Sequence, residues 1–210
     1  TPQSSENCTN SWASMSLAAF IVVMGNSLFT LTSLNLNGIR SATSKGVEAW
    51  LEKAKPDCIC VQEIKAQAPD MAGRFESLAG LQGHFQFAEK KGYSGVGLYT
   101  RLEPSDVRTG YGSGEFDAEG RYVELRFDTP RAKHSIISAY FPSGSSGEER
   151  QQAKFRFLDE FYPHLLRLKA ERARAPDGAF PDLLDQVGPP NVLLVNKGRG
   201  VFEPAPENKS

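Results

Sequence analysis

Residues 56–63 read PDCICVQE, and this stretch decides how the neighbouring segments can fold. Pro56 ends any preceding helix, because its ring clashes with the helical backbone and it lacks an N–H group. The run CICVQ is short and mostly apolar, which is typical of a buried strand. The stretch therefore predicts a strand from Cys58 to Gln62 that is followed directly by a carboxylate, Glu63.

The segment FTLTSLNL, residues 29–36, predicts a second strand with a polar end. Threonines alternate with apolar residues at period two, and Asn37-Gly38 predicts a turn after the strand. One amphipathic helix should connect the two strands, with a candidate cap at Ser44 and an end before Pro56. The apolar residues at helical spacing are Val47, Trp50, Leu51 and Ala54.

The polar ends of these two strands should lie side by side, because sequential strands joined by one helix are often neighbours. This arrangement places the Glu63 carboxylate beside the amides of Asn35 and Asn37. Mg²⁺ prefers one or two carboxylates together with phosphate oxygens and water, so Glu63 is a candidate metal ligand. Taken alone, a glutamate after a buried strand is more often a helix cap or a surface charge.

The middle of the chain predicts short strands and two further helices. Strands rich in β-branched and aromatic residues are expected at 84–88, 96–101, 122–127 and 135–140. A helix capped by Asp70 is expected to reach Leu78, and a longer helix begins near Glu149 and is kinked or restarted around Pro163. This order of elements predicts a mixed α/β fold with helices packed on a largely antiparallel sheet.

The composition indicates one globular domain without a dominant charge. The chain has 210 residues, of which 40% are hydrophobic and 10% aromatic, enough to bury a sizeable core. Its 24 basic and 25 acidic side chains give a formal charge of −1, so any nucleic-acid contact must come from a local cluster. Three cysteines provide no zinc site and favour a reducing compartment, with Cys58 and Cys60 as buried thiols.

Both ends of the chain differ in character from the middle. Residues 15–24, MSLAAFIVVM, are apolar but too short to span a bilayer, and no Lys or Arg precedes Arg40. We therefore expect no export signal, and we interpret residues 1–23 as a leader. Residues 173–210 are rich in proline and are interpreted as a tail, apart from a strand-like run from Asn191 to Val195.

Five sequence strings occur in order along the middle of the chain: LNLNGIR from Leu34, PDCICVQEIKAQ from Pro56, KKGYSGVGLYTR from Lys90, DAEGRYVELRF from Asp117 and SAYFPSGSSGEERQQAKFRF from Ser138. Together they resemble the exonuclease III / AP endonuclease family over residues 29–172. GYSGVG and AYFPSG favour this DNA-repair branch over phosphodiesterases of the same superfamily that act on lipids or small phosphate esters. The resemblance implies a four-layer α/β sandwich with two mostly antiparallel sheets, in which residues 24–172 are the N-terminal part of the nuclease domain.

The resemblance also implies a function and a set of site residues. The activity would be Mg²⁺-dependent phosphodiester hydrolysis, as an AP endonuclease and 3′–5′ exonuclease, with Mn²⁺ as a second option for the metal. The partner would be double-stranded DNA with abasic sites or 3′ ends. The full-length parent would be a monomer of bacterial type, cytoplasmic and nucleoid-associated, without membrane contact. The implied catalytic residues are Tyr140, Glu63 and Asn35, and the implied metal ligands are Glu63 and Asn37. The implied DNA-binding residues are Arg40, Gly92, Tyr93 and Arg121. Lys65, Lys90 and Lys91 would add local positive charge.

One part of the family pattern is absent from this sequence. The family places a water-activating aspartate in a GDxN string after the long helix and an Asp-His pair later, whereas this chain contains neither a Gly-Asp nor an Asp-His dipeptide. We therefore expect a chain truncated to roughly the first sheet and its helices, a tail consistent with a frameshift, and impaired activity. An uncovered sheet would expose apolar surface and favour aggregation. The alternative is a DNA-binding fragment that does not cut.

Overall fold

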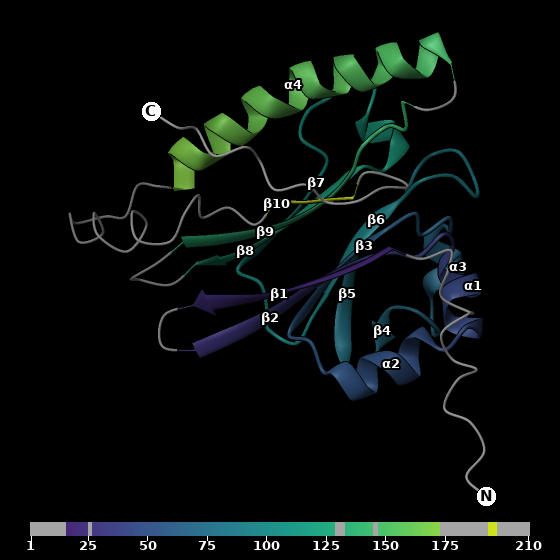
Figure 1. Ribbon diagram of the computed structural model, residues 1–210, viewed down its shortest axis with the longest axis vertical. Helices are drawn as coiled ribbons and strands as arrows, with labels where there is room; N and C mark the ends of the chain where they lie inside the picture. Colours follow the sequence, from purple (N-terminus) through teal and green to yellow (C-terminus); the bar gives the residue numbers. More distant parts are fainter. Residues whose placement is uncertain (1–15, 25–26, 129–132, 145–146, 173–192, 197–210) are drawn as a thin grey trace, which may run out of the picture.

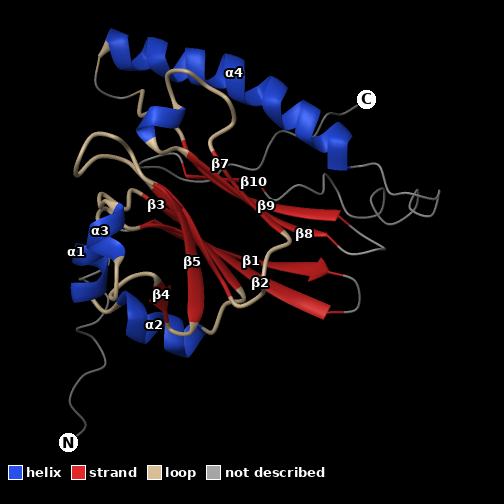
Figure 2. Cartoon of the chain, turned by 180° about the vertical axis from the view of Figure 1, so that it is seen from behind, coloured by secondary structure: helices blue, strands red, loops and turns tan. Residues whose placement is uncertain are grey.

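The computed structural model describes residues 16–24, 27–128, 133–144, 147–172 and 193–196 (Figure 1). The described residues form two β-sheets that lie face to face, with helices on the outer side of each (Figures 1 and 2). The long helix lies over one sheet, and the short helices lie on the opposite side of the molecule. The predicted class, a four-layer α/β sandwich, is confirmed.

Within the described residues, the larger sheet has six strands in the order β1-β2-β3-β6-β5-β4. β2 and β3 pair in parallel, and the other pairs of this sheet are antiparallel. The strands are β1 (Ser16–Met24), β2 (Ser27–Asn35), β3 (Cys58–Gln62), β4 (Ser77–Leu78), β5 (Leu81–Gln86) and β6 (Val96–Thr100). β3 has the predicted bounds, whereas β5 begins and ends earlier in the chain than expected.

The parallel pairing of β2 and β3 needs a crossover, which α1 (Ile39–Ser44) and α2 (Val47–Ala54) supply. The predicted apolar periodicity of α2 is confirmed, since Val47 and Leu51 are buried in the apolar cluster under the sheet. The predicted cap at Ser44 is wrong. Ser44 ends α1, and α2 follows Gly46, whose φ of 88° allows the chain to turn between the helices.

The helix predicted from Asp70 to Leu78 is wrong in its extent. α3 covers Ala68–Met71, and the Asp70 carboxylate lies inside it, where it accepts a hydrogen bond from the Gln67 backbone N–H (2.8 Å). Gly73 follows with a φ of 68°, a left-handed conformation that ends helical structure. The apolar residues that suggested the helix are nevertheless all buried: Met71, Phe75 and Leu78.

Within the described residues, the smaller sheet has four strands in the order β10-β9-β8-β7. They are β7 (Asp106–Thr109), β8 (Tyr122–Asp128), β9 (Lys133–Tyr140) and β10 (Leu193–Asn196), with a 3-10 turn at Asp117–Glu119 before β8. We did not predict β7, whose four residues are all exposed and lack an alternating pattern. The helix α4 (Glu148–Arg172) covers the outer face of this sheet and continues through Pro163 without restarting (Figure 1).

The two sheets bury an apolar layer between them, so the chain retains more of the second sheet than we expected. The layer takes side chains from both sheets: Phe29, Leu31, Cys58, Cys60, Val96, Leu98, Val123, Leu125 and Ile136. Burial raises the pKa of both thiols in it, and both cysteines are free, as predicted for core residues. The expectation of an uncovered apolar sheet face is therefore wrong for the strands that line this layer.

The two ends of the chain are described in part. Residues 16–24, which include all of the described part of the predicted leader, form β1 and pair with β2 along their whole length. Residues 1–15, and the predicted tail apart from 193–196, lie outside the described residues. The strand-like run near the C-terminus forms β10, which is parallel to β9 with Asn196 opposite Tyr140. Among the described helices, none is long and apolar enough to cross a membrane.

The layer between the sheets predicts a large effect of removing a buried leucine. Leu125 is 0% exposed in this layer, whereas Leu102 is 48% exposed. Leu125→Ala should lower the free energy of unfolding by about 2–5 kcal/mol, because a cavity remains. The matched control, Leu102→Ala, should change it by less than about 0.5 kcal/mol. Urea unfolding followed by circular dichroism measures both, and equal effects of the two variants would contradict this packing.

Candidate active site

The ends of strands from both sheets meet at one edge of the sandwich. Asn35 ends β2 and lies opposite Gln62 at the end of β3, so the predicted pairing of the two polar strand ends is confirmed. The Gln62 side-chain amide donates a hydrogen bond to Oγ of Ser138 in β9 (3.3 Å), which links the two sheets. Tyr140 ends β9 two residues later. This contact between the sheets therefore brings Tyr140 to the ends of β2 and β3.

Glu63, which directly follows β3, is the centre of a hydrogen-bonded group. Its Oε1 accepts hydrogen bonds from Nδ2 of Asn35 and Oη of Tyr140, both at 2.9 Å. Its Oε2 lies 2.8 Å from Nζ of Lys65, which also donates to Oδ1 of Asn37 over 2.6 Å. The Oδ1 of Asn35 accepts a hydrogen bond from the Asn37 backbone N–H at 3.0 Å. We refer to Asn35, Asn37, Glu63, Lys65 and Tyr140 as the Glu63 cluster.

The pKa values of the two central groups of the cluster, the Glu63 carboxyl and the Tyr140 hydroxyl, are shifted in opposite directions. Burial of Glu63 raises the pKa of its carboxyl, but the hydrogen bonds from Lys65, Asn35 and Tyr140 outweigh burial, so the pKa lies below its ordinary value. Burial and the adjacent Glu63 carboxylate raise the pKa of Tyr140 far above its ordinary value. At neutral pH the cluster therefore holds an ionised carboxylate and a neutral phenol that can donate a hydrogen bond.

The backbone around the cluster is held in conformations that side-chain-bearing residues rarely adopt. The φ angles are 47° at Asn37, 52° at Glu63, 50° at Lys65 and 42° at Ser94. Each such residue costs on the order of 1–3 kcal/mol, and strain of this kind concentrates at functional sites. Backbone hydrogen bonds hold these conformations in place. The N–H of Gly38 donates to the Glu63 carbonyl (2.8 Å), and the N–H of Lys65 donates to the Ser94 carbonyl (2.9 Å).

Arg121 lies next to the cluster and is 3% exposed. Its guanidinium donates to the carboxylate of Glu119, the backbone carbonyl of Tyr140 (2.8 Å) and the Oη of Tyr93 (3.1 Å). It also lies 5.1 Å from the centre of the Tyr140 ring, within the range of a cation–π interaction. The structure therefore places Arg121 where it orients Tyr140 and Tyr93, with its charge balanced by Glu119.

The other residues predicted to bind DNA lie on the surface. Arg40 is exposed and forms a 3.1 Å ion pair with Asp70. Gly92 has a φ of 69° and open space where a side chain would stand. Tyr93 is half-buried, and Nζ of Lys90 lies 5.5 Å from its ring centre. Asn35, Asn37, Glu63 and Tyr140 thus form a tight cluster with Arg121 and Tyr93 beside it, whereas Arg40 pairs with Asp70 outside the cluster and Gly92 faces open space.

The donor set of the cluster fits a hard divalent cation. The oxygens predicted as ligands, from Glu63 and Asn37, already share one cationic partner, the Lys65 ammonium. Carboxylate and amide oxygens are ligands that Mg²⁺ accepts, with phosphate oxygens and water completing its shell. In the described part of the chain, no group of three or more His, Cys, Asp and Glu residues is close enough to hold a metal ion.

Two residues at the site were not assigned a contact from the sequence. Lys65 was predicted as a source of local positive charge, and Glu119 was not predicted to belong to the site. The available signal was the spacing of opposite charges, because Lys65 stands two residues after Glu63 and Glu119 two residues before Arg121. That spacing is common on protein surfaces, where ion pairs contribute little, so it could not select these residues.

The fold agrees with what comparison with known proteins shows. The model of the Endonuclease/Exonuclease/phosphatase family matches residues 32–189, more than half of the chain. The chain belongs to this family.

Individual relatives indicate the branch of the family. A DNA-(apurinic or apyrimidinic site) endonuclease from Dictyostelium discoideum is 31% identical over 68% of this chain and 38% of its own length. Exodeoxyribonuclease III from Haemophilus influenzae is 35% identical over 63% of this chain and 48% of its own length. The structure of an AP endonuclease from Archaeoglobus fulgidus is similar with a TM-score of 0.54 and 30% identity, over 63% of this chain and 49% of that one. The predicted resemblance is confirmed, and the chain spans less than half the length of each of these relatives.

The lowered pKa of Glu63 predicts a pH-dependent contribution to stability. Because the folded-state value lies below the unfolded value of about 4.3, the contribution is fully present above that pH and is lost as the pH falls through the folded-state value. Glu63→Gln removes this titration. The difference in free energy of unfolding between the wild type and the variant should be constant above about pH 5 and should decrease in more acidic solution.

Urea unfolding at a series of pH values measures this difference. In a Lys65→Met background the pH-dependent part should be smaller, because Lys65 supplies the strongest of the favourable contacts to Glu63. A difference between the wild type and Glu63→Gln that does not change with pH would show that the carboxylate gains nothing from the cluster.

Proposed function

We propose that the chain carries part of the active site of a DNA-repair nuclease, which hydrolyses phosphodiester bonds as an AP endonuclease and 3′–5′ exonuclease. The observation that supports this most is the hydrogen bond from Tyr140 to Glu63, which joins residues 77 positions apart. It combines an ionised carboxylate, a ligand for a hard cation, with a neutral phenol that can donate to a phosphate oxygen. The similarity to a DNA-(apurinic or apyrimidinic site) endonuclease and to an exodeoxyribonuclease III supports the assignment.

Each residue of the Glu63 cluster has a chemical role in this proposal. Glu63 and Asn37 would hold Mg²⁺ or Mn²⁺ through their side-chain oxygens, and Asn35 would fix the orientation of Glu63 through its hydrogen bond. When bound, such a metal polarises a phosphoryl oxygen and neutralises charge that develops on the phosphate. Tyr140 would donate a hydrogen bond to a phosphate oxygen or assist proton transfer.

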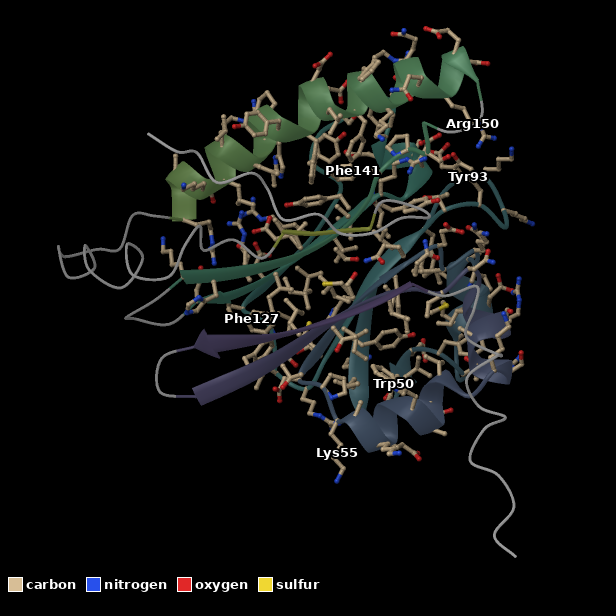
Figure 3. All side chains as sticks on the ribbon, viewed as in Figure 1. Trp50, Lys55, Tyr93, Phe127, Phe141 and Arg150 are labelled. Atoms are coloured by element: carbon tan, nitrogen blue, oxygen red, sulfur yellow. The ribbon has the colours of Figure 1, made fainter. Side chains whose placement is uncertain are left out.

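The surroundings of the cluster suit a phosphate backbone. Gly92 leaves its backbone amide open to close approach, and the exposed Arg40 presents a guanidinium fork that matches phosphate oxygens. Tyr93 and Arg150 project at the same end of the sandwich in Figure 3, near the start of α4. We propose that the substrate is duplex DNA with abasic sites or 3′ ends. We also propose that the full-length parent enzyme is a monomer of bacterial type, located at the nucleoid in the cytoplasm.

We also propose that residues 1–210 cut DNA weakly by themselves. Glu63 is the one carboxylate of the Glu63 cluster, and the sequence has no Gly-Asp or Asp-His dipeptide to supply the water-activating group that the family uses. Hydrolysis needs a general base in addition to charge stabilisation, whereas binding to DNA does not. The second candidate function is therefore a DNA-binding fragment without nuclease activity.

A cleavage and binding assay with one substrate distinguishes these possibilities. The chain is incubated with Mg²⁺ and a duplex that holds a synthetic abasic site, and strand cleavage and retention are measured together. We expect salt-sensitive binding with slow cleavage that Glu63→Gln removes. Rapid cleavage that is lost in Glu63→Gln would refute the proposed impairment. Absence of both binding and cleavage would refute the proposed function.

The salt dependence of DNA binding predicts different behaviour for two arginines. Arg40 is exposed, so if it contacts a phosphate, Arg40→Gln should reduce the slope of log K against log salt by about 1. Arg121 is buried and paired with Glu119, so Arg121→Gln should weaken binding through displacement of Tyr140 and Tyr93 while the slope stays the same. Fluorescence anisotropy over a range of salt concentrations measures both. A reduced slope for Arg121→Gln would assign that residue to direct phosphate contact.

A further inference from the structure

We propose that Lys65 is an exchangeable internal counter-ion of the metal site. Its ammonium lies between Oε2 of Glu63 and Oδ1 of Asn37, and a divalent cation held by these oxygens would have to displace it. The displaced ammonium then becomes available to a phosphate of the bound nucleic acid. This inference rests on the proposed function, because it assigns a mechanism of metal and DNA coupling to the same site.

The first observation concerns the groups that already contact the two carboxylate oxygens of Glu63. Oε1 accepts two hydrogen bonds, from Asn35 and Tyr140, so its lone pairs are in use. Oε2 contacts the Lys65 ammonium at 2.8 Å. A cation that binds Glu63 without breaking the bonds to Asn35 and Tyr140 must therefore approach Oε2, where Nζ of Lys65 lies.

The second observation is that the same ammonium bridges oxygens of two residues that follow different strands, β2 and β3. Nζ of Lys65 lies 2.6 Å from Oδ1 of Asn37 as well as 2.8 Å from Oε2 of Glu63. A metal ion held by these two oxygens would fall on the position of Nζ. Two positive charges at one position repel each other strongly, so the ammonium and the metal exclude each other.

The third observation is that the Lys65 side chain is more exposed than that of Glu63. The backbone of Lys65 is fixed, since its N–H donates to the Ser94 carbonyl at 2.9 Å. Its side chain is 35% exposed, against 17% for Glu63, and lysine has four rotatable carbon–carbon bonds that can carry Nζ into solvent. The ammonium can therefore leave while the carboxylate remains held by Asn35 and Tyr140.

This exchange has two consequences for binding. Displacement of the lysine weakens metal affinity in the absence of DNA, and a phosphate that receives the released ammonium recovers that loss. Metal and DNA should therefore strengthen each other's binding, and the coupling must be the same in both directions. The lysine would act as a positioning residue that makes metal loading depend on the presence of a phosphodiester.

Metal binding by the complete chain tests the proposal without any measurement of activity. Mn²⁺ is titrated against the wild type, Lys65→Met, Lys65→Arg and Glu63→Gln, and free Mn²⁺ is followed by electron paramagnetic resonance. The control is Lys53→Met, because the Lys53 side chain is exposed on α2. Lys65→Met should bind Mn²⁺ about ten-fold more tightly than the wild type, because no charge has to be displaced. Lys65→Arg and Lys53→Met should bind like the wild type. Equal or weaker binding by Lys65→Met would overturn the proposal.

The coupling is tested with the same variants and an abasic-site duplex. Mn²⁺ should strengthen DNA binding by the wild type more than by Lys65→Met, by a factor of about five or more. Equal strengthening in both would overturn the release of Lys65 toward phosphate. The same data distinguish failure of this inference from failure of the proposed function. If Glu63→Gln removes Mn²⁺ binding but Lys65→Met leaves it unchanged, only the exchange is refuted. If no variant binds Mn²⁺, both are refuted.

Discussion

The parallel pairing of β2 with β3 is the constraint on which the site depends. It places Asn35 opposite Gln62, and the next residue, Glu63, then falls within reach of the Asn35 amide. A parallel pair requires a crossover, which the chain makes through α1 and α2 over one face of the sheet. Any change in the register of this pair by one residue would turn the polar strand ends to opposite faces and separate the carboxylate from the amide.

Contact between the two sheets completes the site. The apolar layer supplies most of the attraction, but Gln62, which is 0% exposed, gives the contact a fixed register through its hydrogen bond to Ser138. A buried amide left without a partner would cost on the order of 1–3 kcal/mol. The arrangement of the two sheets that pairs the Gln62 amide is therefore favoured over other arrangements. Because Tyr140 lies two residues after Ser138 on the same strand, this arrangement also fixes the distance between its hydroxyl and Glu63.

Local patterns in the sequence were sufficient for some parts of this structure. Alternation predicted β2, a short apolar run predicted β3 and helical spacing predicted α2. The adjacency of Asn35 and Glu63 followed from these elements. Tyr140 could be assigned only through resemblance, because no local pattern relates residues that are 77 positions apart. The helix predicted to reach Leu78 failed since periodicity reports burial, and the left-handed Gly73 overrides it. β7 lies at the exposed edge of its sheet and carries no apolar pattern to detect.

The role of Arg121 differs in kind from these local features. The family resemblance predicts that its guanidinium binds DNA, whereas the tertiary structure surrounds it with Glu119, Tyr93 and the Tyr140 carbonyl.

The left-handed backbone at Asn37, Glu63 and Lys65 has a consequence for how this site can change by mutation. Threonine, valine and isoleucine are excluded there by their own branched side chains, before any chemical role is considered. Asparagine and aspartate tolerate this conformation best among residues with side chains, so position 37 can exchange an amide for a carboxylate without rebuilding the turn.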